Sequence, residues 1–179
     1  ELKVKYSFND SLSFENTFYR SFIEDALLYD SSFNGGSGYT NNKSNLKQDG
    51  IESNIVFKNS NQKFSIFNTI SSSKQTDGSQ QLNRPDTTYG ISYDIDIPNS
   101  LFGPLSINYN YKHYGKSFDF KPSKTKVDST DIMNLSISKD LNFGILRFNI
   151  TNLLNEKYQR PEGYEQNGRL FRFNLKRYF

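Results

Sequence analysis

The sequence lacks cysteine and tryptophan altogether and has a single methionine among its 179 residues. Without cysteine the chain can hold no disulfide, no thiolate metal site and no thiol nucleophile. A strong charge of one sign is also missing, because 22 basic and 19 acidic residues leave a formal charge of only +3. Nucleic acid is therefore not predicted as a partner.

Long apolar runs are absent as well. No stretch approaches the roughly 18 consecutive apolar residues that a membrane-spanning helix requires. Residues 1–30 also lack the pattern of a secretory signal. Helical insertion into a membrane is thereby excluded. Insertion as β-strands stays open, because a spanning strand needs an apolar side chain only at every second position.

Aromatic residues, by contrast, are plentiful. They make up 16% of the chain, although apolar residues in total make up only 34%. Disordered segments are poor in aromatic and β-branched residues. The composition therefore predicts a folded chain built mainly from strands.

Apolar and polar residues alternate with a period of two through most of the chain, which is the pattern of a strand with one apolar face. For example, Leu105 and Ile107 alternate with Ser106 and Asn108. The alternation predicts an all-β fold, an antiparallel meander of about nine strands. These strands are expected at about residues 2–8, 12–23, 46–58, 63–71, 89–97, 105–112, 133–138, 146–151 and 171–179.

The connections between these strands alternate strictly in length. Short turns rich in Asn, Asp, Pro and Gly are expected at residues 9–10, 59–62, 98–104 and 140–142, and long polar connections at about 24–45, 72–86, 115–129 and 154–168. A meander of this kind has tight turns at one end and elaborated loops at the other. That arrangement is typical of an outer-membrane barrel.

The two strand faces differ in a way that also favours a membrane barrel. The polar faces carry mostly Asn, Ser and Thr, which suits a lumen better than a soluble surface dense in Lys and Glu. Aromatic residues near strand ends, such as Tyr6, Tyr89 and Tyr111, could form the girdles of a membrane barrel, or could simply reflect the preference of aromatics for strands. Phe67 is an exception, since it falls on the face opposite Phe64.

An odd number of strands cannot close a bacterial barrel, because such barrels have even strand numbers and no open edge. An unpaired first strand would leave backbone groups without partners in lipid, at a cost of several kcal/mol each. We therefore expect further strands upstream of Glu1 and interpret Phe179 as a genuine C-terminus.

The closing hairpin carries a more specific signal. It contains residues 152–158 (NLLNEKY), Gly163-Tyr164, Gly168-Arg169 and a last strand LFRFNL that leads to Tyr178-Phe179. This order resembles the C-terminal end of TonB-dependent outer-membrane receptors. Residues 18–28 and the stretch 39–52, which ends in Gly-Ile-Glu, resemble strands of the same family.

The resemblance implies that residues 1–179 are the C-terminal part of a 22-stranded barrel around a plug, with the plug and the earlier strands outside this sequence. It implies active import of a scarce nutrient, such as cobalamin or a ferric siderophore, across the outer membrane of a Gram-negative cell. The implied partners are that small-molecule ligand, outer-membrane lipid and lipopolysaccharide, the TonB complex acting through the missing N-terminal part, and the barrel-assembly machinery. No cofactor is implied.

The resemblance places ligand capture on the outer loops and the upper lumen wall, where aromatic and Arg side chains are the usual anchors of recognition. The candidates are Tyr29, Phe33, Tyr39, Arg84, His113, Phe118, Arg160 and Tyr164. The resemblance further assigns the assembly signal to Phe171, Phe173, Leu175 and Phe179. Lys116, Lys121, Lys124 and Lys126 make one loop basic, which suits either contact with anionic lipopolysaccharide or plain solvation.

No motif for catalysis or metal binding is present. His113 has no nucleophile and orienting partner at a recognisable spacing. Asp119, Asp128 and Asp131 match no calcium-loop spacing. We therefore predict neither an enzyme nor a metal site. The sequence leaves three alternatives open: a small diffusion porin, an outer-membrane protease or phospholipase that uses His113, and a soluble β protein.

Overall fold

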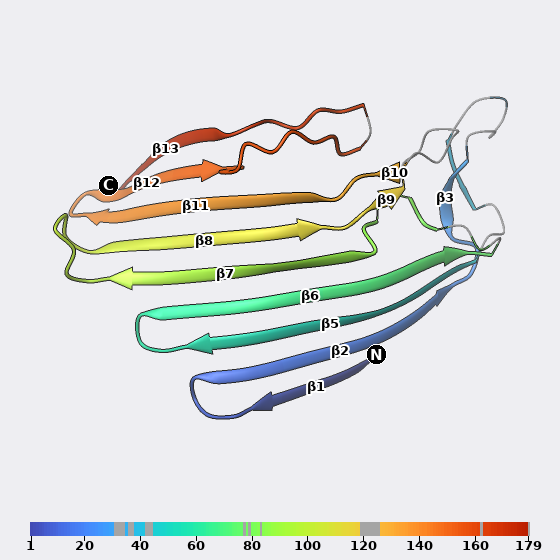
Figure 1. Cartoon of the computed structure of the whole chain (residues 1–179), viewed down its shortest axis with the longest axis horizontal. Coiled ribbons are helices and arrows are strands. Elements are labelled where there is room, and N and C mark those ends of the chain that lie inside the picture. Colours follow the sequence, from blue (N-terminus) through green and yellow to red (C-terminus); the bar gives the residue numbers. More distant parts are fainter. Residues whose placement is uncertain are drawn as a thin grey trace.

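A computed structural model describes residues 1–30, 35, 38–41, 45–76, 78, 80–82, 84–118, 126–161 and 163–178. Its main feature is one nine-stranded antiparallel sheet in the order β1-β2-β5-β6-β7-β8-β11-β12-β13 (Figure 1). The strands are β1 Leu2–Ser7, β2 Leu12–Ile23, β5 Leu46–Lys58, β6 Gln62–Gln75, β7 Thr87–Ile97, β8 Leu105–Tyr114, β11 Thr130–Leu141, β12 Gly144–Thr151 and β13 Leu170–Arg177. The predicted meander of nine strands is confirmed.

Two small sheets lie in segments where the sequence analysis placed only loops. β3 Leu27–Asp30 pairs with β4 Gly38–Asn41, and β9 Ser117–Phe118 pairs with β10 Lys126–Val127. These pairs are too short for a period of two to stand out in the sequence. β6 and β11 also extend beyond their predicted bounds, because ladder hydrogen bonds need no apolar side chain.

The short turns are built by local side-chain chemistry. Asn9 Oδ1 accepts hydrogen bonds from the backbone N–H of Ser11 (2.9 Å) and of Leu12 (2.8 Å). Asn59 Oδ1 repeats this arrangement with Asn61 (3.1 Å) and Gln62 (2.9 Å). An Asn that binds the backbone two or three residues on mimics a backbone turn, which is why these positions reverse the chain. All short turns gather at one end of the sheet and β3, β9 and β10 at the other (Figure 1).

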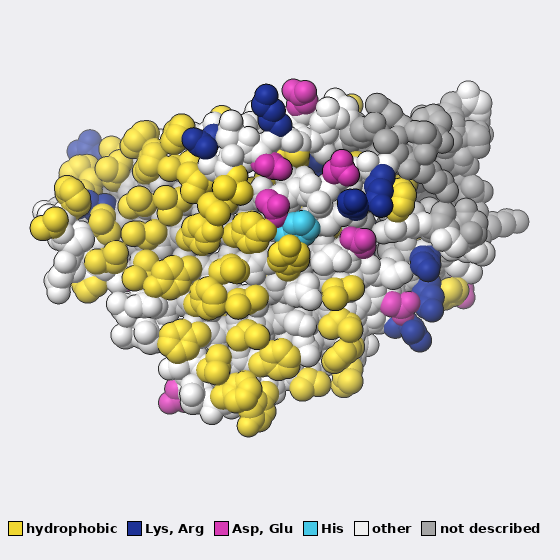
Figure 2. Space-filling view, viewed as in Figure 1, with side chains coloured by type: hydrophobic (Ala, Val, Ile, Leu, Met, Phe, Trp, Pro, Cys, Tyr) yellow, Lys and Arg dark blue, Asp and Glu magenta, His cyan; other side chains and the backbone are white. Residues whose placement is uncertain are grey.

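The sheet forms a single layer with no apolar core of its own. Among the described residues, the buried hydrophobic ones are only Ala26, Leu46 and Val127. Large apolar side chains are instead exposed, for example Phe173 at 74% and Leu2 at 63%. Figure 2 shows them gathered on one broad face of the sheet. An exposed apolar field of this size must be covered by another apolar phase or by a partner.

The strand register separates the two faces. Ile91 lies opposite Tyr111, and Tyr111 opposite Met133, so apolar side chains stand in rows on one face. On the other face polar side chains bind one another across strands, as Ser106 does with Asp96 and Asn108 with Asp94, both at 2.6 Å. We call these the apolar face and the polar face. The described residues contain no helix that could cross a membrane.

Candidate functional site

Four side chains gather on the polar face near the end of the sheet that carries the long loops. We call Phe67 of β6, Lys112 and Tyr114 of β8, and Arg160 of the last loop the loop-end cluster. Lys112 Nζ lies 4.6 Å from the ring centre of Tyr114 and 6.0 Å from that of Phe67. Arg160 Cζ lies 4.8 Å from the same Tyr114 ring. The cluster therefore presents two cations held on aromatic faces.

Gly90 of β7 makes room for this cluster. It stands between Phe67 and Lys112 in the strand register. A Cβ atom at Gly90 would lie only 2.6 Å from Cζ of Phe67, so the Phe67 ring occupies the space that a side chain would fill. A glycine inside a strand often marks a place where another group approaches the backbone closely.

Arg160 is the most constrained member of the cluster. One terminal nitrogen donates to the Gly115 carbonyl at 3.2 Å, while the buried Nε–H has no acceptor. Burial lowers the pKa of the guanidinium below its ordinary value, although Tyr114 and Tyr158 act in the opposite direction. An Arg remains charged at neutral pH despite such a shift. The charge of this guanidinium on the polar face can attract an anionic ligand.

Asn152 holds the start and the end of the last loop together. Its side-chain NH₂ donates to the carbonyls of Glu156 (2.9 Å) and Asn167 (3.2 Å), and its Oδ1 accepts from the Glu156 N–H at 2.9 Å. Asn152 is 5% exposed and has a φ of 53°, a region in which Asn is enriched. The NLLNEKY segment therefore positions the loop that carries Arg160.

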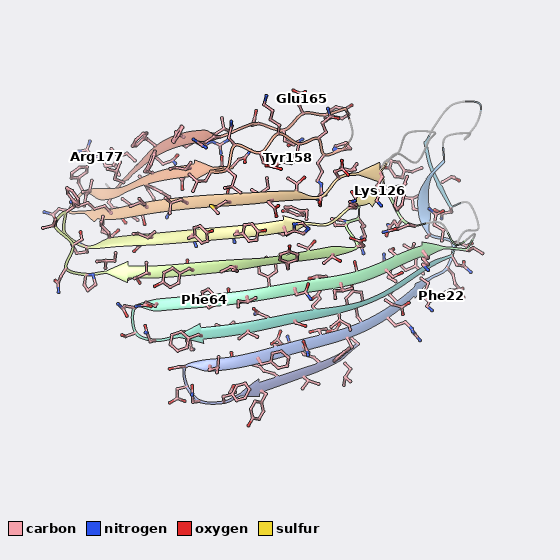
Figure 3. All side chains as sticks on the ribbon, in the orientation of Figure 1. Phe22, Phe64, Lys126, Tyr158, Glu165 and Arg177 are labelled. Atoms are coloured by element: carbon pink, nitrogen blue, oxygen red, sulfur yellow. The ribbon has the colours of Figure 1, made fainter. Side chains whose placement is uncertain are left out.

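A cavity of about 540 Å³ lies between the last loop and the segment that leads into β11. Its lining includes the cations Lys126 and Lys157, the acids Glu156 and Glu165, and Tyr158. Figure 3 labels Lys126, Tyr158 and Glu165, which come from these two segments. The mixed charges give the cavity donors and acceptors for a polar ligand without a strong net preference for one sign.

The structure brings several predicted ligand residues together. Tyr29 and Tyr39 lie opposite each other in the β3–β4 pair, and Tyr39 is exposed. Arg160 belongs to the loop-end cluster, and its backbone N–H donates to the Tyr164 carbonyl at 3.2 Å. Phe118 pairs with Lys126 in the β9–β10 sheet. Their role in ligand binding stays a prediction.

The other predicted ligand residues lie apart from this group. Arg84 is exposed on the connection before β7, and Phe33 falls outside the described residues. His113 lies on the apolar face, where it stacks on Tyr89 with ring centres 4.5 Å apart and has Nδ1 2.8 Å from Asp131 Oδ1. This position turns His113 away from the loop-end cluster.

The predicted assembly signal lies on the edge strand β13. Phe171, Phe173 and Leu175 are all exposed on the apolar face, and Phe148 of β12 packs against the first two. Phe179 falls outside the described residues. Recognition by an assembly machinery stays a prediction.

Sequence reasoning missed Lys112, Tyr114 and Gly90 as site residues. Lys112 and Gly90 read as ordinary polar-face positions in their strands, and Tyr114 stands beyond the predicted end of its strand. The one available signal was Phe67, an aromatic residue on the polar face. Its neighbours across the sheet depend on register, which the sequence did not reveal.

Solved structures share this fold at low sequence identity. The FrpB iron transporter from Neisseria meningitidis has a TM-score of 0.72 at 12% identity, covering 96% of this chain and 29% of its own. The copper transporter OprC has a TM-score of 0.74 at 13% identity, covering 94% and 29%. The ferripyoverdine receptor of the outer membrane of Pseudomonas aeruginosa has a TM-score of 0.70 at 13% identity, covering 94% and 25%. The chain thus spans less than a third of each.

No curated protein matches the chain in sequence. A family model described as TonB dependent receptor-like, beta-barrel matches residues 1–153. The match runs from β1 to the end of β12 and includes both small sheets. It confirms the resemblance inferred from the sequence, and the similar solved structures are transporters and receptors rather than enzymes. The chain belongs to the TonB-dependent receptor-like β-barrel family.

Proposed function

We propose that this chain is the C-terminal barrel part of an outer-membrane receptor that imports a scarce nutrient in a TonB-dependent manner. The plug, the earlier strands and the contact with the TonB complex belong to the part of the protein that precedes residue 1. The apolar face lies in the lipid of a Gram-negative outer membrane, and the polar face lines the transport path. The loops around β3, β9 and β10 face the outside and contact lipopolysaccharide.

The loop-end cluster is the observation that carries the proposal. It places two cations and two aromatic rings on the polar face, at the end where a ligand would enter. Two neighbouring cations attract an anion, and aromatic rings add contact area with little loss of conformational entropy. This chemistry suits a large anionic ligand with conjugated or ring-containing groups.

A ferric siderophore is the ligand class that we favour. The similar structures include an iron transporter and a ferripyoverdine receptor, which supports this class. Cobalamin is the alternative within the same proposal. The two classes differ in net charge. Many ferric siderophores are anionic and would be attracted by the two cations of the cluster, whereas a neutral corrinoid would not.

Uptake by cells that express the full-length protein as their sole receptor tests this proposal. Iron-55 siderophore complexes and labelled cobalamin are supplied separately, with and without an uncoupler of the proton gradient. We expect energy-dependent iron uptake, which falls at least tenfold in Arg160→Ala because a buried charged contact to the ligand is lost. Arg147→Ala serves as the matched control. Arg147 of β12 is also a cation on the polar face, but it lies away from the long loops.

The outcomes separate the alternatives. Energy-dependent uptake of cobalamin alone would show that the ligand is cobalamin and not a siderophore. Uptake that persists after uncoupling would indicate a diffusion porin and would overturn the proposal. An equal loss of uptake in the Arg160 and Arg147 variants would show that the loop-end cluster does not bind the ligand.

A further inference from the structure

The Tyr114 ring contacts both cations of the loop-end cluster. Lys112 Nζ lies 4.6 Å from the ring centre, and Arg160 Cζ lies 4.8 Å from it. Lys112 stands two positions before Tyr114 on the same face of β8, whereas Arg160 belongs to the loop between β12 and β13. One aromatic side chain therefore joins a cation of the sheet to a cation of a loop that is distant in sequence.

The surroundings of Tyr114 leave room for both contacts. In the strand register Thr88 of β7 and Thr130 of β11 stand opposite Tyr114, and both have short side chains. The carbonyl of Gly115, the next residue along the chain, accepts a hydrogen bond from one terminal nitrogen of Arg160 at 3.2 Å. The backbone thus holds one nitrogen of Arg160, and the Tyr114 ring holds the centre of the guanidinium.

Among the described residues, no carboxylate pairs with either cation. The ion pairs that these residues form include neither Lys112 nor Arg160. Opposite Lys112 in the register stand Gly90 and Ile132, which carry no charge. An aromatic ring attracts a cation through the negative charge of its face and leaves the full charge of the cation in place. A carboxylate in the position of the ring would instead cancel one of the two positive charges.

The shared ring also limits the separation of the two charges. Both distances end at one ring centre, so Lys112 Nζ and Arg160 Cζ lie less than about 10 Å apart. The Debye length at physiological ionic strength is about 8 Å, so salt does not fully screen the two charges from each other. A ligand with one anionic group can make close contact with only one of them, whereas a ligand with two such groups can bind both.

We propose that Tyr114 is a positioning residue that spaces Lys112 and Arg160 so that they bind two separate anionic groups of one ligand. This inference rests on the proposed function and narrows its ligand class to molecules with two or more anionic groups within about 10 Å of each other. The ring acts through the two cations and need not touch the ligand. Its hydroxyl has no part in this role, because both cations lie over the ring.

Two small probes measure this preference without depending on transport. Terephthalate carries a carboxylate at each end of a benzene ring, and benzoate carries only one. Calorimetry on the purified full-length protein in detergent measures the affinity for each probe, at low ionic strength to limit screening. We expect the protein to bind terephthalate about tenfold more tightly than benzoate, because the second carboxylate gains its own charge-assisted hydrogen bonds.

Four variants and a control assign the preference to the cations and the ring. In Lys112→Gln and in Arg160→Gln the two probes should bind equally within about twofold, since a single cation holds a single carboxylate. Tyr114→Leu should lose the preference in the same way, whereas Tyr114→Phe should keep it because the ring face is retained. Tyr19→Leu is the matched control and should also keep it, because the polar-face ring of Tyr19 lies across Gly50 and outside the cluster.

Equal affinity of the unaltered protein for the two probes would overturn the proposal, as would a preference that survives in folded Tyr114→Leu protein. Loss of the preference in Tyr114→Phe would overturn it too, because the ring face would then not be what spaces the cations. If Tyr114→Leu does not fold, Tyr114→Met supplies the same test with a side chain that adapts to irregular packing. A protein that prefers terephthalate but imports no labelled nutrient would refute the proposed function alone.

Discussion

Asn152 shows how a single side chain determines the shape of a long connection. It follows directly on β12, and three hydrogen bonds of its amide tie residues 152, 156 and 167 together. A second Asn of the same segment, Asn155, accepts from the Arg169 N–H at 2.9 Å just before β13 begins. The two Asn side chains of NLLNEKY thus bind backbone groups and fix the course of the loop.

We predict that Asn152→Ala destabilises the protein. The change removes three partly buried hydrogen bonds, so the free energy of unfolding should fall by about 2–3 kcal/mol. Urea titration of the full-length protein in lipid vesicles measures this. Asn142→Ala, at an exposed turn residue, is the control and should cost less than about 0.5 kcal/mol. Equal costs would show that the Asn152 amide does not hold the loop.

On the polar face, two strand glycines leave space for aromatic rings of the neighbouring strands. The Phe67 ring of β6 lies across Gly90 of β7, and the Tyr19 ring of β2 lies across Gly50 of β5. Both glycines are strand residues with ordinary backbone conformations, so close approach, rather than backbone freedom, explains them.

The two glycines should respond differently to the same substitution. The atoms nearest to a Cβ at Gly50 belong to the Tyr19 side chain, which can rotate away, whereas the atom nearest to a Cβ at Gly90 is the backbone carbonyl oxygen of Tyr111. Gly90→Ala should therefore cost about 2 kcal/mol and Gly50→Ala less than about 1 kcal/mol. Urea unfolding in vesicles compares the pair. The reverse order would mean that the β7–β8 backbone yields more easily than the Tyr19 ring.

The sheet as a whole has no hydrophobic core to stabilise it, so its stability depends on what covers its two faces. Three buried hydrophobic residues among those described cannot hold nine strands together in water. The outer-membrane location proposed above supplies an apolar phase to one face of this single-layer sheet and leaves the other face to a polar interior. Stability should therefore depend on which face carries a charge.

Adjacent residues in the middle of β7 test this dependence. Ile91 lies on the apolar face and Ser92 on the polar face. Ile91→Lys should lower the free energy of unfolding in vesicles by about 2–4 kcal/mol, because a cation at the bilayer midplane is costly. Ser92→Lys should change it by less than about 1 kcal/mol, since that side chain faces the polar interior. Similar losses would contradict the assignment of the faces.

The nine long strands, their two faces and the alternation of short and long connections were all predictable from the sequence alone. These features are local: a period of two is visible within one strand, and Asn9 or Asn59 acts on residues only two or three positions away. The family motif near the C-terminus was visible for the same reason, since its residues are close in sequence.

The contacts between residues of different strands were not predictable from the sequence pattern. Arg160 reaches the loop-end cluster from the last loop, whereas strand register sets Phe67 and Lys112 on either side of Gly90. A one-residue change of register would move each of these side chains to the other face. Alternation within a strand is compatible with many registers, so the sequence pattern predicted the faces but could not predict the neighbours across the sheet.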